Sequence, residues 1–236
     1  DIIDINMGCP AKKVCNVLYG SALLTDESLV ARILAAVASA VNVPVTLKTR
    51  TGWDRDHRNA VNIARIAEAS GIAAIAVHGR TRADFYTGDA EYETIRSIKD
   101  SVRIPVIANG DIDTPAKARA VLDFTRADSV MIGRAAHGAP WIFRDVNGQI
   151  TSSKKITPLS RSARRDIILE HLDSLYAFYG EDTGVRVARK HLGWYLTKLQ
   201  HGTELRRELM AAENSSLQFA LTRRGLDGWA DGVDAA

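Results

Sequence analysis

Five short apolar segments, each ending in a turn, constrain the fold of this chain more than any other feature. The segments are 2–5, 44–49, 74–79, 105–110 and 129–134. Each is rich in valine or isoleucine and apolar on both faces, a pattern typical of a parallel strand that is covered on both sides. Stretches with helical spacing of apolar residues separate them. This alternation predicts βα units and an α/β fold with a parallel sheet.

The expected helices of this part are bounded by local signals. Gly71 follows one of them as a C-terminal cap, and Thr114 with Pro115 forms an N-cap and a first-turn proline. The helices are expected over 26–41, 60–70, 92–101 and 115–123.

Polar residues follow every predicted strand. An open doubly wound sheet concentrates its ligand at one switch point, whereas a (β/α)8 TIM barrel gathers functional residues from all its carboxyl strand ends. Five contributing ends favour the barrel, and the last two resemble the phosphate site that barrels build after strands 7 and 8. The five strands are then strands 4 to 8. We expect three further βα units, about 90 residues, to precede Asp1 in an N-terminally truncated chain.

The β signal stops after residue 150. Residues 151–160 are rich in serine, threonine and proline and predict a linker. Helices are expected over 162–179, 185–199, 204–212 and 216–222, and the tail from Arg223 is expected to fray. We therefore divide the chain into a barrel part at 1–150, the linker at 151–160 and a small all-α domain at 161–236.

The composition excludes several classes of protein. Hydrophobic residues make up 46% and charged residues 25%, the balance of a soluble globular protein. No apolar run approaches the ~18 residues of a membrane span, and the chain opens without a leader peptide. Two cysteines cannot form a disulfide scaffold, so we expect a reducing compartment. The net charge of +3 is compatible with a polyanionic partner without indicating one.

The turn after the first predicted strand contains a candidate acid, Cys9, in the sequence NMGCP. A thiol with a pKa of about 8.5 stays protonated near neutral pH and can donate a proton into a pocket. A free cysteine is more often a buried structural residue, and the residue type alone favours that alternative.

Eight motifs occur in an order that resembles the tRNA-dihydrouridine synthase family, most closely its bacterial B-type branch. Each motif alone is weak, but the ordered set is highly specific, above all NMGCPAKKV together with VHGRT. The motifs occupy residues 4–14, 20–24, 45–53, 78–82, 107–112, 131–136, 140–143 and 188–196.

The resemblance implies a flavin-binding (β/α)8 barrel followed by a helical domain. It implies an enzyme that reduces the C5–C6 double bond of uridine in tRNA, with FMN as cofactor and NADPH as the reductant. We also expect a monomeric, cytoplasmic enzyme that uses neither a membrane nor a metal, since no second metal ligand stands at suitable spacing from His78.

The resemblance assigns roles to the first motif. The family's cysteine is the general acid, which implies this role for Cys9. Asn6 is expected to hydrogen-bond the uracil edge, although its amide could equally hold its own loop. Cys15 stands where the family usually has asparagine, and we interpret it as a bystander.

Four residues after the middle strands are implied to contact flavin or substrate. Lys48 would place a cation beside the N1–C2=O edge of the flavin, where the reduced form is anionic; the alternative is a lysine that extends to solvent. His78 would contact the FMN ring or phosphate, although a histidine on an apolar strand is more often a core residue. Arg50 and Arg80 are expected to contact the substrate.

The turns after the last two strands predict a phosphate site. Glycine lets backbone N–H groups reach phosphate oxygens, a following helix N-terminus adds a favourable dipole, and an arginine adds a charged clamp. Each turn alone could be an ordinary βα turn. We expect Asp111 to contribute through its backbone, with its carboxylate turned away, for example to cap the helix at Thr114. The site residues are Asn109, Gly110, Asp111, Gly133 and Arg134.

Basic and aromatic residues alternate over 186–195, as in segments that bind RNA phosphates and stack on bases. The residues alone favour an ordinary solvated face, with Trp194 and Tyr195 in the core. The resemblance implies tRNA contacts by Arg186, Lys190 and His191.

Two other functions stay open. A flavin barrel that reduces a free pyrimidine or a small enone would use the same strand ends but would not need the helical part. A chain that lacks the first three strands of its barrel could instead bind RNA without catalysis.

Overall fold

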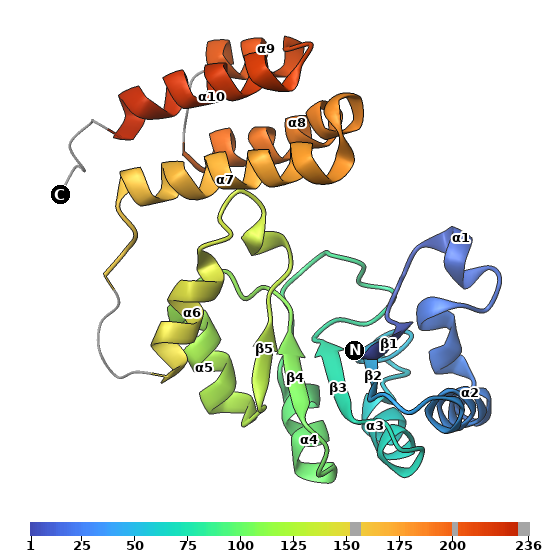
Figure 1. Cartoon of the computed structure of the whole chain (residues 1–236). Helices are drawn as coiled ribbons and strands as arrows, with labels where there is room; N and C mark the ends of the chain where they lie inside the picture. Colours follow the sequence, from blue (N-terminus) through green and yellow to red (C-terminus); the bar gives the residue numbers. More distant parts are fainter. Residues whose placement is uncertain (152–156, 200–202, 231–236) are drawn as a thin grey trace. The chain divides into compact units, whose positions relative to one another are not determined.

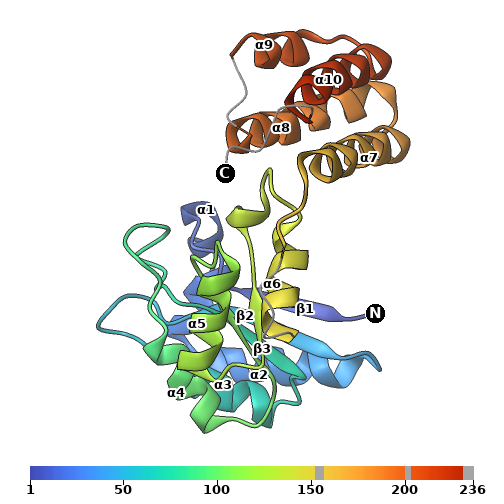
Figure 2. The same ribbon diagram turned by 90° about the vertical axis from the view of Figure 1, so that its left-hand side faces the viewer.

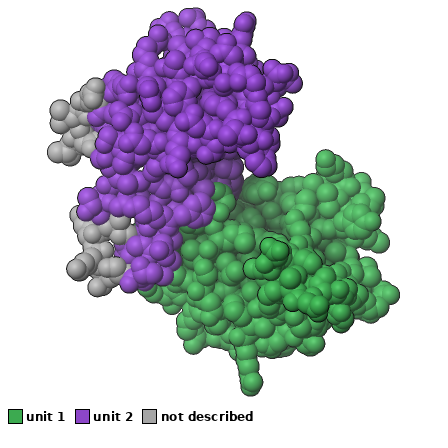
Figure 3. Space-filling model, viewed as in Figure 1, with its two compact units in different colours: residues 1–133 green, residues 134–236 purple. Residues whose placement is uncertain are grey.

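The computed structural model describes residues 1–151, 157–199 and 203–230. The chain forms two compact units, residues 1–133 and residues 134–236 (Figure 3). The first unit contains a parallel sheet with its helices, and the second is helical (Figure 1).

The sheet of the first unit has five parallel strands in the order β1-β2-β3-β4-β5. A doubly wound sheet would reverse this order at a switch point, whereas successive strands of a barrel wall are neighbours in sequence order. The predicted parallel α/β fold is therefore confirmed, with strand order as in a barrel. The strands are β1 (Ile3–Met7), β2 (Val45–Arg50), β3 (Ala74–His78), β4 (Val106–Asn109) and β5 (Ser129–Met131).

Four helices alternate with these strands, and each packs against the next one along the chain (Figure 1). The predicted cap at Thr114 is confirmed: its side chain accepts a hydrogen bond from the backbone N–H of Lys117, and Pro115 occupies the first turn. A short helix and a 3₁₀ helix lie between β1 and α2. The helices are α1 (Lys12–Cys15), η1 (Gly20–Thr25), α2 (Glu27–Ala40), α3 (Ala60–Ala69), α4 (Glu93–Ser101) and α5 (Pro115–Thr125).

The two faces of the sheet differ. Side chains alternate between faces along a strand, and register partners in parallel strands share a face. On the three central strands, one face is buried and apolar except for one threonine, as expected for the face that the helices cover. Its residues are Leu47, Thr49, Ile75, Val77, Val106 and Ala108.

The second unit is helical throughout its described residues, which confirms the predicted all-α part (Figure 2). Its helices α7, α8, α9 and α10 pack around a core that includes Leu172, Leu192 and Leu209. The elements are η2 (Arg134–Ala136), α6 (Ile142–Thr151), α7 (Arg161–Tyr179), α8 (Glu181–Lys198), α9 (Thr203–Ala211) and α10 (Ser215–Ala230).

The expectation that the tail frays from Arg223 is wrong as far as Ala230, because α10 continues to that residue. Leu226 is buried and packs with Ile168 and Tyr195. Gly225 lies where a Cβ would come within 2.3 Å of Leu205, so glycine here serves helix packing.

The proposed linker falls partly outside the described residues. Thr151 is the last residue of α6, and residues 152–156 are not described. The division of the chain at residue 150 stays a prediction.

Candidate active site at the strand ends

Strand register collects five of the predicted site residues on one face of the sheet. Asn6 is the register partner of Lys48, Arg50 is the partner of His78, and His78 is the partner of Asn109. They alternate with the buried apolar row, so they lie on the opposite face. The sequence therefore brings a polar row to the carboxyl end of the sheet.

The turn that carries Cys9 is held by its backbone. The Cys9 carbonyl accepts hydrogen bonds from the Ser21 hydroxyl at 2.8 Å and from the Ser21 N–H at 3.1 Å. Gly20 has φ +59, and a Cβ there would lie 2.7 Å from the same carbonyl oxygen, so this position needs glycine. The side-chain oxygen of Asn6 accepts a hydrogen bond from the Gly8 N–H at 2.9 Å. This contact holds the loop, which was the alternative role expected for Asn6.

Cys15 is a neighbour of this turn. Its buried thiol lies 3.6 Å from the Cys9 carbonyl oxygen and 3.6 Å from the Ser21 hydroxyl. Both cysteines are free thiols. Cys15 therefore contacts the Cys9 turn, and the interpretation of Cys15 as a bystander in catalysis stays a prediction.

Arg50 is buried, with 2% of its surface exposed. Its guanidinium donates to the carbonyls of Gly8 at 2.9 Å, Thr81 at 2.8 Å and Phe85 at 2.8 Å. Burial lowers the pKa of Arg50, and the Cys9 thiol is close enough to oppose that shift. Arg50 thus ties the Cys9 turn to the loop after β3, and its predicted substrate contact stays a prediction.

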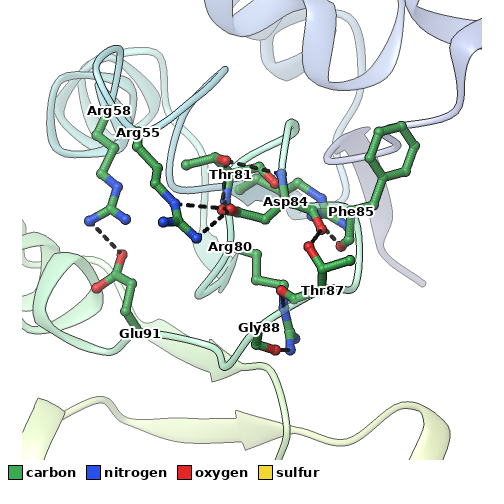
Figure 4. Close-up of polar contacts among 10 residues, drawn as sticks. Arg55, Arg58, Arg80, Thr81, Asp84, Phe85, Thr87, Gly88 and Glu91 are labelled. Atoms are coloured by element: carbon green, nitrogen blue, oxygen red, sulfur yellow. Dashed lines mark hydrogen bonds and ion pairs between the residues drawn. The ribbon is translucent and has the colours of Figure 1, made fainter.

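Arg80 is also buried, at 3% exposure, in the loop drawn in Figure 4. It forms a two-point pair with the Asp111 carboxylate at 2.9 and 2.7 Å and donates to the carbonyls of Thr87 at 3.2 Å and Gly88. Since these contacts engage its donors inside the protein, the geometry favours a structural role, and the predicted substrate contact stays untested.

The Asp111 carboxylate turns away from the predicted phosphate site, as expected, but it does not cap the following helix. It pairs with Arg80 and accepts the N–H of Ala90 at 2.8 Å instead. Thr114 fills that cap. The backbone of Asp111 has φ +47, a left-handed conformation that the two-point pair holds in place.

The remaining side chains of the loop bond to one another. Asp84 accepts the N–H and hydroxyl of Thr81 at 2.9 and 2.7 Å and the Nε of Arg55 at 3.2 Å (Figure 4). The loop over 80–91 is therefore a fixed wall beside the polar row.

His78 is electrically neutral in this setting. Burial, followed by the charges of Arg50, Lys48 and Arg80, lowers the pKa of His78 to about 3. Its Nε2 lies 3.3 Å from a guanidinium nitrogen of Arg80. Because a guanidinium only donates, Nε2 accepts and the proton resides on Nδ1. His78 therefore presents one neutral N–H donor.

Lys48 is a second cation of the row, beside Arg50. Burial, and then the charge of Arg50, lowers the pKa of Lys48 to about 8. A half-buried ammonium beside another cation gains from an anionic ligand, which would raise that pKa again. The position therefore suits a negatively charged edge of a cofactor.

The predicted phosphate end has one position where glycine is required. Gly110 has φ +124, and a Cβ there would lie 2.7 Å from Ala90 Cβ and 3.0 Å from His78 Cδ2. Asn109 donates its amide to the Met131 carbonyl at 2.8 Å. A Cβ at Gly133 would meet no described atom within 4 Å.

The other predicted residues belong to the second unit. Arg134 begins η2, and Arg186 and Lys190 are exposed on α8. His191 is half-buried, and burial lowers its pKa. These four residues belong to a different compact unit from the sheet.

The two aromatic residues of α8 have different surroundings. Lys190 Nζ lies 4.7 Å from the Trp194 ring centroid, and His137 stacks on that ring at 3.9 Å with a 3° angle. Tyr195 is 3% exposed, with its hydroxyl 2.8 Å from His171 Nδ1. Tyr195 is therefore a core residue, and Trp194 is already covered by neighbours.

Sequence reasoning missed Tyr86. Its ring centroid lies 5.6 Å from the Arg50 guanidinium carbon and 6.3 Å from the His78 ring, although the side chain is 56% exposed. Only its place in the loop after β3 could have indicated it. No group of metal-binding side chains and no helix suited to crossing a bilayer occurs among the described residues.

The parallel strand order and the polar row define an α/β barrel-type enzyme site. The chain belongs to the dihydrouridine synthase (Dus) family, which its sequence matches over residues 1–224. The predicted resemblance is therefore confirmed.

Several relatives share most of this sequence. The tRNA-dihydrouridine synthase B of Xanthomonas axonopodis pv. citri is 58% identical over 235 residues, which cover 100% of this chain and 71% of that protein. The protein of the same name from Pseudomonas aeruginosa is 57% identical, covering 94% and 67%. That of Pseudomonas syringae pv. tomato is 57% identical, covering 99% and 69%.

Proposed function

We propose that this protein reduces uridine to dihydrouridine in tRNA, and that residues 1–133 perform the chemistry. Membership of the dihydrouridine synthase family and relatives named tRNA-dihydrouridine synthase B support this proposal. The observation that carries it is the fixed Cys9 turn at the end of the strand beside Lys48. We further propose that the enzyme works as a monomer in the cytoplasm.

FMN is the proposed cofactor and NADPH the proposed reductant. The donor set of the polar row fits FMN: Lys48 is a half-buried cation and His78 a neutral N–H donor. FMN, when bound and reduced by NADPH, would supply a hydride to C6 of the uracil ring. Lys48 would hold the anionic edge of the flavin, and His78 its ring or phosphate.

The phosphate of the cofactor would be held at the later turns. Backbone N–H groups near Gly110 and Gly133 offer hydrogen bonds without charge. The phosphate contact of Arg134, the first residue of the second unit, stays an expectation from the sequence. Asn109 and Asp111 would contribute by fixing the turn, since their side chains bond to Met131, Arg80 and Ala90.

Cys9 is the proposed proton donor. With a hydride at C6, the ring needs one proton at C5, and a thiol can give it and be reprotonated from water. Asn6 would hydrogen-bond the uracil edge with its remaining amide atoms. Arg50 and Arg80 would shape the pocket wall, in addition to the substrate contact expected from the sequence.

The helical unit is proposed to bind the tRNA backbone through Arg186, Lys190 and His191. The two basic residues are exposed to solvent, as phosphate contacts require.

The two cysteines allow a matched test. The purified protein is incubated with FMN, NADPH and unmodified tRNA, and dihydrouridine is counted by nucleoside mass spectrometry. Cys9→Ala should lower the rate by about 10² to 10⁴, the usual contribution of a general acid. Cys15→Ser keeps a hydrogen-bonding group and should stay within about threefold of wild type.

The outcomes separate the parts of the proposal. Equal product from Cys9→Ala would remove Cys9 from its role while keeping the enzyme. Oxidation of NADPH without dihydrouridine in the wild type would indicate a flavin enzyme with another acceptor.

A further inference from the structure

The segment after α1 exposes three consecutive large apolar side chains. Val17, Leu18 and Tyr19 are 57%, 62% and 65% exposed. Their backbone is nevertheless ordered, because Leu18 N–H donates to Cys15 O at 3.1 Å and Tyr19 N–H donates to Val14 O at 3.2 Å. Leu18 adopts φ +56, which turns the chain sharply. An ordered backbone that leaves such side chains unpacked is typical of a contact surface.

This segment adjoins the Cys9 turn. Tyr19 is followed by Gly20, whose Cα region lies against the Cys9 carbonyl, and by Ser21, which donates two hydrogen bonds to it. The exposed side chains are therefore continuous with the proposed active site and belong to the same unit.

The charge around the segment has one sign. Residues 9–25 contain two lysines, Lys12 and Lys13, and no acidic residue. Both lysines are exposed, and neither forms an ion pair with a described residue. Exposed aromatic side chains beside unpaired ammonium groups suit single-stranded nucleic acid, since bases stack on the ring and phosphates pair with the cations.

We propose that Tyr19, with Lys12 and Lys13, binds the RNA strand next to the target uridine. A base adjacent to that uridine stacks on the Tyr19 ring, and the flanking phosphates contact the two lysines. This inference rests on the proposed function, because it names how the same site takes its RNA. A second copy of the chain or another protein could also cover apolar side chains, but the lysines and the nearby thiol favour RNA.

The first test measures the dissociation constant and KM for an unmodified tRNA transcript. Tyr19→Ala should raise both about five- to tenfold, at the lower end of the loss seen when a stacked aromatic is removed. It should change kcat less than KM, because the proton donor is untouched. Tyr19→Phe, which keeps the ring, should resemble wild type. The matched control is Phe124→Ala on α5, which truncates another exposed aromatic (42%) of the same unit and should stay within about twofold.

The second test concerns the lysines. The double variant Lys12→Ala/Lys13→Ala should make the slope of log affinity against log salt shallower by about 1.4, the value for two lost contacts to a single strand. An unchanged slope would remove the lysines from the RNA contact and overturn that part of the proposal.

The outcomes distinguish this surface from the proposed function. If Tyr19→Ala binds tRNA like wild type and has the same KM, the surface is overturned while catalysis stands. A second outcome is that Tyr19→Ala binds tRNA more weakly than wild type, as predicted, while the wild type forms no dihydrouridine. The proposed reaction would then be wrong and the RNA-binding surface would stand. If Tyr19→Ala abolishes self-association without altering RNA affinity, the surface belongs to a second copy and the proposal is wrong.

Discussion

Two sets of basic residues, one in each unit of this protein, have opposite surroundings. In the sheet unit, Arg50 and Arg80 are 2% and 3% exposed and bond to carbonyls and a carboxylate. In the helical unit, Arg186 and Lys190 are exposed to solvent. A buried charge is stable only when its hydrogen bonds are made, and the bonds then fix its surroundings. An exposed charge costs little and suits a polyanion, whose counterions it releases.

The difference teaches where geometry has to be fixed. The buried arginines hold the Cys9 turn, the loop over 80–91 and the end of β4 together. Burial, followed by the charges of Arg50 and Arg80, also keeps His78 neutral, and burial with the charge of Arg50 lowers the pKa of Lys48. The exposed charges of α8 need no such framework, because water solvates them.

The largest expected effect comes from breaking the buried pair. Arg80→Met leaves the Asp111 carboxylate and the carbonyls of Thr87 and Gly88 without their donor, and should lower the free energy of unfolding by about 3 to 5 kcal/mol. Chemical denaturation measures this loss. The control variant Arg55→Met loses the ion pair with Asp84, in which the arginine side chain is 73% exposed. Its free energy of unfolding should therefore change by less than about 1 kcal/mol. Equal losses would contradict the contrast between buried and exposed charge.

A pH profile sharpens the same contrast through His78. The pKa of His78 is lowered to about 3 in the folded protein, against 6.5 when it is free. Between these values the unfolded chain binds more protons, so the free energy of unfolding falls as the pH is lowered through this window. His78→Asn removes this contribution, so its free energy of unfolding should fall less than that of wild type between pH 7 and about 4. Urea denaturation at each pH measures this difference.

The helical unit supplies a background for that profile. Burial also lowers the pKa of His171 and His191, which therefore act in the same direction in both proteins. Parallel pH profiles of wild type and His78→Asn would contradict a lowered pKa of His78 in the folded protein.

A smaller effect is expected inside the helical unit. Tyr195→Phe removes the hydroxyl that lies 2.8 Å from His171 Nδ1 and should cost about 1 kcal/mol in thermal or chemical unfolding. The control is Tyr179→Phe at the exposed end of α7, with an effect below about 0.5 kcal/mol. If Tyr195→Phe left the stability unchanged, the hydrogen bond of the buried hydroxyl would contribute nothing to it.

Local sequence patterns predicted most of the fold. The apolar runs placed all five strands, and capping signals such as Thr114 with Pro115 placed the helices of the sheet unit. The extension of α10 was missed because Gly225 and Gly228 suggested a fraying tail. The packing of Gly225 against Leu205 and of Leu226 in the core depends on a neighbouring helix that local sequence does not reveal.

The candidate site was predicted in position but not in contacts. Strand ends located Lys48, His78 and Asn109, because parallel strands bring their carboxyl ends to one edge. The partner of Asp111 is Arg80, 31 residues away, and no periodicity links the two. The burial of Arg50 likewise depends on the carbonyls of Thr81 and Phe85, 31 and 35 residues later. From the sequence alone, a charged residue at a strand end suggested a ligand contact.

The most direct test of the account is a crossed binding measurement on two variants. Dissociation constants for FMN and for unmodified tRNA are determined for Lys48→Met and for the double variant Arg186→Ala/Lys190→Ala. We predict that Lys48→Met weakens FMN about tenfold, a loss of about 1.4 kcal/mol, and leaves tRNA within about twofold. We predict that the double variant weakens tRNA and flattens its salt dependence, while FMN affinity is unchanged. If either variant weakened both ligands to the same extent, the division of labour between the two units would be contradicted.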